Sequence, residues 1–349
     1  MKIIYVLVFL ITGLFAQITE KCYSQPSEPV HAALDGIVRQ YYEEGKFNGS
    51  IIVADNSGII YENILGYRDI DKKKRLKDET LMGLASVSKI FTSTAVMKLV
   101  GTGKISLDES IRKYLPDLPE FYDAVSIKHL LTHTSGITDC LMAPVYEVYN
   151  QDIYSFVTKQ EELEFAPGTR YKYCNTAYVL LAMIIEKASG ESYQEYLDKN
   201  IFSPCGMENT VVGRDLSDKK FARSYHVSGS VDDRTNYYCG PGEIYTTAKD
   251  LYKFDCAYFQ GKVLSPGLVE KVLLRNTLDD GSYTNYGLGW GIYKMGDEYL
   301  LGHTGGNYGF RSLYEHQKKS GLTIIILSNI GDKTPVMEIR NTIANALQI

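Results

Sequence analysis

The stretch SVSKIFTSTAVMKLV, Ser86–Val100, places a serine and a lysine three residues apart at the start of an apolar helical run. Residues at i and i+3 share one face of a helix, so the Lys89 amine can reach the Ser86 hydroxyl. The N–H groups of a first helical turn and the helix dipole also favour the oxyanion that forms on acylation. The segment therefore predicts a serine nucleophile at a buried helix start that faces a cleft.

The same S-x-x-K spacing occurs twice more, at Ser110–Lys113 and at Ser217–Lys220. Ser110 lies in a polar stretch before Pro116, and Ser217 lies in a charged loop, so both patterns favour a surface position. Helix capping is a structural alternative for any such serine, Ser86 included.

A second candidate is Tyr173-Cys174-Asn175, which follows a Pro-Gly-Thr turn and precedes a helical pattern. A phenol near a lysine ammonium can act as a phenolate-like proton shuttle, and the Asn175 amide can bind a substrate carbonyl or position the lysine. A helix cap with a packed aromatic ring is the structural alternative. Tyr-x-Asn also occurs at Tyr61 and Tyr283, as expected by chance in a chain with 28 tyrosines.

The third candidate is the sequence GHTGG, Gly302–Gly306, on a predicted strand near the C-terminus. Small residues let a substrate backbone lie along a strand, and a free N–H there can complete an oxyanion hole. A glycine-rich turn is the alternative. Two other segments resemble this motif, and we expect structural roles for both. Lys319–Gly321 is interpreted as a hairpin tip, and His133–Gly136 as a segment whose histidine is structural.

The pattern of elements around these motifs predicts an α+β fold. Predicted strands lie near both ends of the chain and predicted helices lie between them, which indicates an antiparallel sheet interrupted by a helical insertion. The expected strands are 49–54, 59–66, 287–294, 299–302, 310–316 and 322–327, and the expected helices are 30–42, 89–100, 127–131, 178–188, 193–200, 247–258 and 335–347.

Composition limits the classes of function. The chain has 349 residues, with 37 Lys and Arg against 42 Asp and Glu, a net charge of −5. This acidic balance argues against nucleic-acid binding, which needs a basic face. The motifs GxSxG, HExxH, GxxxxGK[ST] and GxGxxG are absent from the sequence. We therefore expect no metal and no cofactor, and no nucleophile elbow of the α/β-hydrolase type.

The N-terminus predicts export. Lys2 precedes an apolar run, Ile3–Ala16, with a small residue at its end, which is typical of a signal peptide. The run is short for a membrane helix of about 20 residues, although an uncleaved anchor is the alternative. We expect a signal peptide at 1–16, a flexible leader at 17–28, a periplasmic or extracellular protein, and no membrane span after cleavage.

The cysteines are widely and irregularly spaced, without a CxxC pair, which argues against a zinc site or a disulfide scaffold. We expect most of them to be unpaired and buried, and the sequence leaves their pairing open. They are Cys22, Cys140, Cys174, Cys205, Cys239 and Cys256.

The order and separation of the three motifs resemble those of the serine hydrolases of the penicillin-binding protein and class C β-lactamase superfamily. The resemblance extends to the stretches 129–137, 167–190, 201–210, 286–292 and 302–312, and it covers the chain from about Pro29 onward. It implies a β-lactamase/transpeptidase-like fold with an antiparallel sheet flanked by helices and an all-helical lobe. The α/β lobe would comprise 29–90 and about 236–349, and the helical lobe about 91–235.

The resemblance also implies a role for each motif residue. Ser86 would be the acylated nucleophile, Lys89 its general base, and Tyr173 the relay that protonates the leaving group and later activates water. The backbone N–H groups of Ser86 and Gly306 would form the oxyanion hole. The implied substrate-binding residues are Asn175, His303, Thr304 and Gly305.

One position departs from the family pattern. The third motif of β-lactamases and many transpeptidases begins with lysine, whereas this chain has His303. A histidine attracts a substrate carboxylate only when protonated, below about pH 6.5 unless its surroundings shift its pKa.

The sequence leaves D-alanyl peptidase, D-aminopeptidase, esterase and weak β-lactamase activities open. The partner is a small-molecule or peptide substrate, with cell-wall-derived compounds among the candidates. The alternative is a non-catalytic penicillin- or peptide-binding member of the fold, and the oligomeric state is open.

Overall fold

The computed structural model describes residues 28–140, 148–215, 217–226, 228–232, 234, 237–307 and 309–348. The expected signal peptide and nearly all of the expected leader lie outside these residues, as does Cys22. Within the described residues, no helix has both the length and the apolar character needed to cross a membrane.

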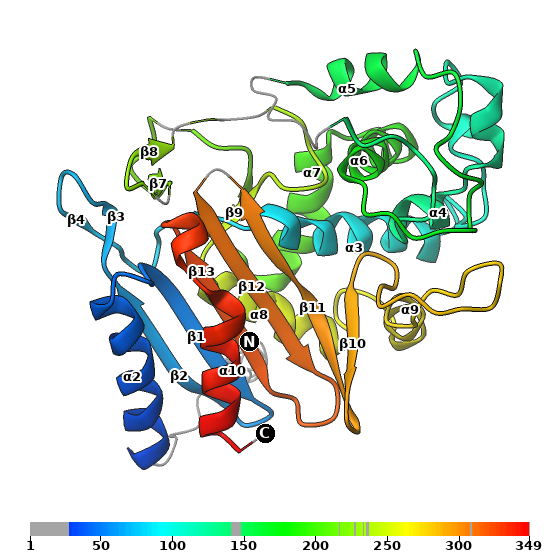
Figure 1. Cartoon of the computed structure of the whole chain (residues 1–349). Helices are drawn as coiled ribbons and strands as arrows, with labels where there is room; N and C mark the ends of the chain where they lie inside the picture. The colour runs from blue at the N-terminus through cyan, green and yellow to red at the C-terminus, as the bar shows by residue number, and fades with distance from the viewer. Residues whose placement is uncertain are drawn as a thin grey trace, which may run out of the picture.

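A six-stranded antiparallel sheet forms the centre of the fold (Figure 1). The strand order is β10-β11-β12-β13-β1-β2, so the two N-terminal strands join the sheet beside the last strand of the chain. This arrangement confirms the predicted α+β class. The strands are β1 (Gly49–Asp55), β2 (Gly58–Leu65), β10 (Gly291–Met295), β11 (Glu298–Asn307), β12 (Phe310–Gln317) and β13 (Thr323–Ser328).

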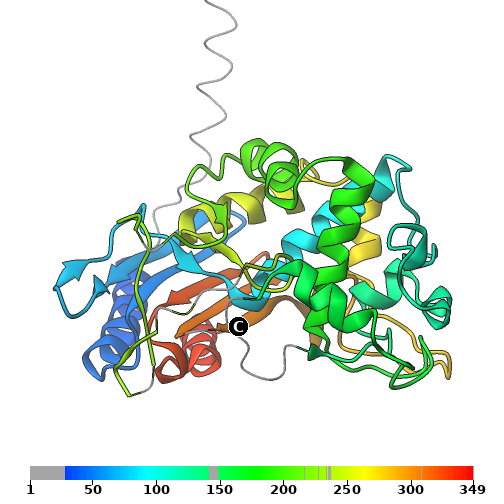
Figure 2. The same cartoon turned by 90° about the horizontal axis from the view of Figure 1, so that it is seen from above.

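Helices cover both faces of this sheet (Figure 2). Helices α2 (Glu28–Glu43) and α10 (Val336–Ala346) pack on one face, and α8 (Ala248–Phe259) packs on the other. Successive side chains of a strand point to opposite faces, so Ile51 and Ile52 belong to two different apolar cores. Every residue of β13 is buried, as expected for a central strand covered on both sides.

The remaining helices gather beside the sheet around α3 (Ser88–Gly101), which packs against α6 (Asn175–Ser189) (Figure 1). Helix α3 is apolar or uncharged nearly all round and almost entirely buried, which explains why its sequence lacks a polar face. The surrounding helices are α4 (Ile127–Leu131), α5 (Asn150–Val157), α7 (Tyr193–Leu197) and α9 (Pro266–Val272).

Several boundaries differ from the predicted ones. Strand β10 begins at Gly291 instead of Gly287, because Gly287 N–H bonds to the Trp290 carbonyl and Gly289 has a φ of 85°. Helix α7 ends at Leu197 and continues as a π-helical turn through Phe202. Helix α2 already begins at Glu28, at the end of the expected leader. The short helices α5 and α9 were not predicted.

The five described cysteines are unpaired. Only Cys174 and Cys205 are buried, whereas Cys140, Cys239 and Cys256 are partly exposed. The expectation of burial was therefore wrong for three of them, which pack against the apolar clusters from the side and keep part of their surface exposed.

A buried ion pair joins β12 to α10, and its removal should be measurable. Arg340 donates from Nε to both Glu315 oxygens at 3.0 Å and from Nη2 to Oε1 at 2.6 Å, with both side chains less than 9% exposed. Arg340→Met leaves a buried carboxylate unpaired and should lower the free energy of unfolding by about 3 kcal/mol in urea titrations. Adding Glu315→Leu should restore most of that loss. The exposed pair Lys113–Glu109 provides a control: Lys113→Met should cost under about 1 kcal/mol. An equal loss in both single variants would contradict this account.

Candidate active site

Ser86 lies in a single 3₁₀ turn, η2 (Ala85–Val87), immediately before α3. The residue before it, Ala85, has a φ of 46°, in the left-handed region that a residue with a Cβ rarely adopts. The serine is therefore presented by a strained turn at the helix entrance, at the helix start that the sequence predicts. Its side chain is partly exposed, whereas Ala85 and Val87 are buried.

Strand β11 packs directly against this turn, and Gly305 makes the approach possible. A Cβ at Gly305 would lie 2.2 Å from the Leu84 carbonyl oxygen and 2.3 Å from Ser312 Oγ. Ser312 Oγ also donates to the Leu84 carbonyl at 2.6 Å, which ties β12 to the same turn. Gly305 is buried, so the structure places it in the packing between β11 and η2. It does not line the surface where the sequence analysis expected it to contact the substrate.

Lys89 is fully buried on the first turn of α3, beneath Ser86. Its Nζ donates to Ser86 Oγ at 3.2 Å, to Asn175 Oδ1 at 2.9 Å and to the Pro241 carbonyl at 2.9 Å. Burial lowers the pKa of Lys89 to about 7, although the nearby Asp139, Cys174 and Glu243 side chains act in the opposite direction. A large fraction of the amine is therefore neutral at pH 7 and can accept the serine proton.

Asn175 begins α6 and is held by Asp139, a residue that the sequence analysis did not identify. Asp139 Oδ2 accepts from the Asn175 N–H at 2.9 Å and from its Nδ2 at 3.0 Å, and Oδ1 accepts from the Thr176 N–H at 3.2 Å. Asp139 thus caps α6 and turns the amide oxygen of Asn175 toward Lys89. Of the two roles considered for Asn175, the structure shows the contact with the lysine.

Tyr173 lies between the lysine and the third motif. Lys89 Nζ is 4.8 Å from the centre of its ring, and the His303 ring is 6.1 Å away. Among the described residues, its buried hydroxyl has no hydrogen-bond partner. Burial raises the pKa of Tyr173 well above its ordinary value, although the neighbouring Ser86 side chain counteracts this rise. The resting side chain is therefore a neutral phenol, and it can give a proton before it takes one.

His133, interpreted from sequence as structural, packs beneath Tyr173. Its ring is 4.3 Å from the Tyr173 ring and 4.8 Å from that of Tyr286. Its Nδ1 accepts from the Cys174 N–H at 3.1 Å, and burial lowers the pKa of His133 well below its ordinary value. The histidine is thus a neutral, buried support that fixes the backbone and the ring of the Tyr173 motif.

His303 stands on β11 and faces the same cluster. Its Nδ1 contacts the Thr304 carbonyl, which can only accept, so the proton lies on Nδ1 and Nε2 accepts from the Tyr286 hydroxyl at 3.0 Å. Burial, reinforced by the charge of Lys89, lowers the pKa of His303 to about 4. The imidazole is therefore neutral at ordinary pH, and it does not replace the cationic lysine found at this position in β-lactamases.

One edge of β11 is open along the third motif. Strand β10 pairs with β11 only as far as Gly302, so among the described strands none covers this edge from His303 to Asn307. Thr304 and Gly306 are both exposed there, while β12 pairs with the other edge. An extended substrate can lie along this edge, as the small residues of the motif predict.

The other copies of the motifs lie elsewhere. Ser110 Oγ accepts from the Arg112 N–H, and Lys113 pairs with Glu109 at the surface. Ser217 Oγ donates to Asp215 at 2.7 Å. Within the described part of the chain, no group of three or more His, Cys, Asp or Glu side chains is arranged to hold a metal ion.

Comparison with known proteins identifies the family of this chain. The model of the Beta-lactamase family matches residues 34–348, nearly the whole described chain. The chain belongs to the beta-lactamase family. The penicillin-binding protein 4* of Bacillus subtilis is 31% identical to this family member over 84% of the chain and 70% of that protein.

Solved structures of the family share the fold. A D-amino acid amidase from Ochrobactrum anthropi SV3, complexed with L-phenylalanine amide, has a TM-score of 0.77 and 26% identity, covering 92% of this chain and 99% of that one. The octameric penicillin-binding protein homologue from Pyrococcus abyssi has a TM-score of 0.80 and 28% identity, covering 91% and 77%.

The pKa of Lys89 predicts a pH profile. The rate at which a fluorophosphonate phosphonylates Ser86, with loss of fluoride, should rise with pH as the ammonium loses its proton, with a midpoint near pH 7. Asp139→Asn removes a carboxylate that raises the pKa of Lys89, so its midpoint should move to lower pH. Glu109→Gln, at an exposed acid beside Lys113, is the matched control and should leave the midpoint in place. A wild-type midpoint near pH 10 would show that Lys89 is an ordinary ammonium.

Proposed function

We propose that the protein is an exported serine hydrolase that acts on amide or ester substrates through a covalent acyl-enzyme on Ser86. The observation that carries the proposal is the buried Lys89 amine, 3.2 Å from Ser86 Oγ, with a pKa of about 7. A serine hydroxyl is a weak nucleophile until a neighbouring base takes its proton, and a desolvated lysine is suited to that role.

In the proposed reaction, Lys89 takes the hydroxyl proton as Ser86 Oγ bonds to the substrate carbonyl carbon. The Ser86 and Gly306 N–H groups stabilise the resulting oxyanion. Tyr173 gives its phenol proton to the leaving nitrogen or oxygen, the bond to that atom breaks, and the Lys89 ammonium returns a proton to Tyr173. Water then attacks the acyl-enzyme with the same groups acting in reverse order, which releases the acid and restores Ser86.

The neutral His303 supports a substrate without a carboxylate beside the leaving group. A peptide that ends in D-alanine and a penicillin both carry such a carboxylate, and a cation at position 303 would attract it. Amides or esters with uncharged leaving groups fit this site better. The D-amino acid amidase among the structural neighbours is consistent with this substrate class.

The alternative is a protein of this fold that binds penicillin or peptides without turnover. Lys89 Nζ donates hydrogen bonds to Ser86 and Asn175 and lies 4.8 Å from the centre of the Tyr173 ring. This complete set of reactive side chains favours catalysis over binding alone.

Labelling of Ser86 tests the proposal. The wild-type protein should be labelled by a fluorescent fluorophosphonate and should hydrolyse 4-nitrophenyl acetate, and Ser86→Ala should lose both activities by at least about a thousandfold, as expected when a nucleophile is removed. Ser110→Ala, at another S-x-x-K motif, is the matched control and should retain both. Equal labelling of wild type and Ser86→Ala would exclude Ser86 as the nucleophile. Labelling without turnover would favour the binding protein.

A substrate panel tests the role of His303. D-Phenylalanine amide and neutral esters should be hydrolysed with a higher kcat/KM than nitrocefin or a peptide ending in D-Ala-D-Ala. His303→Lys should narrow that gap through a lower KM for the two carboxylate substrates, because it restores a cation there. His303→Gln, which adds no charge, is the control and should not narrow it. A higher kcat/KM of the wild type for the carboxylate substrates would contradict the role proposed for the neutral His303.

A further inference from the structure

A cavity of about 610 Å³ lies at the Asn307 end of the open β11 edge. Gly306 and Asn307 form the wall that it shares with the proposed substrate path, and the hairpin of β7 (Ser224–Tyr225) and β8 (Val231–Asp232) lies opposite. Three basic side chains, His226, Arg234 and Arg311, and one acidic side chain, Asp332, line it. The proposed chemistry uses none of them.

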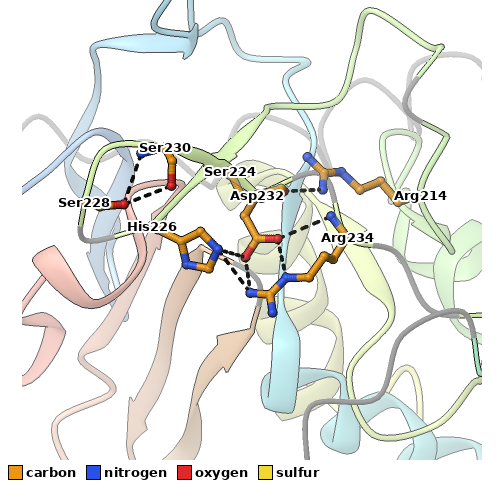
Figure 3. Close-up of polar contacts among 7 residues, drawn as sticks. All are labelled: Arg214, Ser224, His226, Ser228, Ser230, Asp232 and Arg234. Carbon is orange, nitrogen blue, oxygen red and sulfur yellow. Dashed lines mark hydrogen bonds and ion pairs between the residues drawn. The ribbon is translucent and has the colours of Figure 1, made fainter.

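A buried aspartate fixes the orientation of two of these groups (Figure 3). The Asp232 side chain is fully buried and accepts from Arg234 Nε at 2.6 Å and from Nη2 at 2.5 Å, while His226 Nε2 lies 3.1 Å from Oδ2. The Asp232 carbonyl in turn accepts from Ser224 Oγ at 2.7 Å. Asp232 is not part of the cavity wall, so it holds the Arg234 guanidinium in place without offering its own carboxylate to the cavity.

The third basic group lies directly beside the proposed oxyanion hole. Arg311 is the cross-strand partner of Gly306, and a Cβ on that glycine would lie 2.2 Å from Arg311 Nη1. Arg311 pairs with Asp332, whose side chain is 68% exposed. Exposed ion pairs contribute little, so a carboxylate entering the cavity can take the place of Asp332 on Arg311.

The position of Tyr173 tells which end of a substrate reaches this cavity. Tyr173, the proposed proton donor to the leaving group, lies beside His303, at the opposite end of the third motif from Asn307. A substrate extended along β11 therefore has its leaving group near His303 and its acyl part near Gly306 and Asn307. The charged cavity lies at the acyl end, and the neutral imidazole lies at the leaving-group end.

We propose that this cavity is a subsite for a carboxylate on the acyl part of the substrate, bound by Arg234 and Arg311. The proposal rests on the proposed hydrolase function for its kinetic test. Guanidinium groups form strong, charge-assisted hydrogen bonds with carboxylates, and a guanidinium already oriented by a buried partner loses little conformational freedom on binding. The enzyme thus selects acidic acyl groups instead of acidic leaving groups.

Two esters with the same leaving group test this selectivity. Mono-4-nitrophenyl terephthalate carries a rigid carboxylate on its acyl part, and methyl 4-nitrophenyl terephthalate is its neutral counterpart. Wild type should prefer the anionic ester by about tenfold in kcat/KM, mainly through KM, which corresponds to about 1.4 kcal/mol. Arg311→Gln and Arg234→Lys should each lower kcat/KM much more for the anionic ester than for the neutral ester, which removes most of this preference. Arg39→Gln, at an exposed arginine of α2, is the control and should keep the preference.

A binding measurement separates this proposal from the proposed catalytic function. Monomethyl terephthalate should bind Ser86→Ala in calorimetric titrations, and adding Arg311→Gln or Arg234→Lys should weaken binding by about tenfold. If the arginine substitutions weaken binding as expected but no ester is hydrolysed, the carboxylate subsite is supported and the proposed hydrolase function is contradicted. Hydrolysis without preference for the anionic ester would overturn the subsite, and so would an equal loss of activity on both esters in the arginine variants.

Discussion

The rest of the site depends on the removal of the Lys89 amine from water. An ammonium in bulk solvent keeps its proton until about pH 10, whereas this amine is enclosed by α3, the start of α6 and the segment around Pro241. Three acceptors still hold it at 2.9–3.2 Å, so it remains fixed while its pKa falls to about 7. A base placed in this way can activate a serine without a histidine.

The side chains around Lys89 keep its pKa low because most of them are uncharged. The carboxylate of Asp139 is held in place by its hydrogen bonds to the start of α6. Tyr173, His133 and His303 are all neutral at ordinary pH because burial disfavours their charged forms. Asp139 is the nearby carboxyl that also caps a helix, so the same bonds that start α6 orient Asn175 toward the lysine. Glu243 is buried near Lys89 as well, and burial raises its pKa to about 8, which limits how much negative charge it adds near the amine.

Sequence reasoning was strong where a local pattern has a local cause. The runs of β-branched residues in β1 and β13 predicted strands, and the helical pattern at 247–258 predicted α8, which begins at Ala248. It was weaker for β10, where a turn set by Gly289 delays the strand, and for Asp139, which precedes α6 by 36 residues and has no motif of its own. Contacts between segments this far apart in the chain leave no periodic signal.

The sequence by itself determined the α+β class and, through the spacing and order of its motifs, the set of residues that approach Ser86. Only the tertiary structure decided their protonation, because a pKa depends on how completely packing excludes water and on which charges lie nearby. His303 is the clearest example: the sequence shows a group that titrates near neutral pH, and burial beside Lys89 makes it a neutral one. The same packing placed Arg234 and Arg311, from separate strands and loops, around one cavity at the Asn307 end of β11.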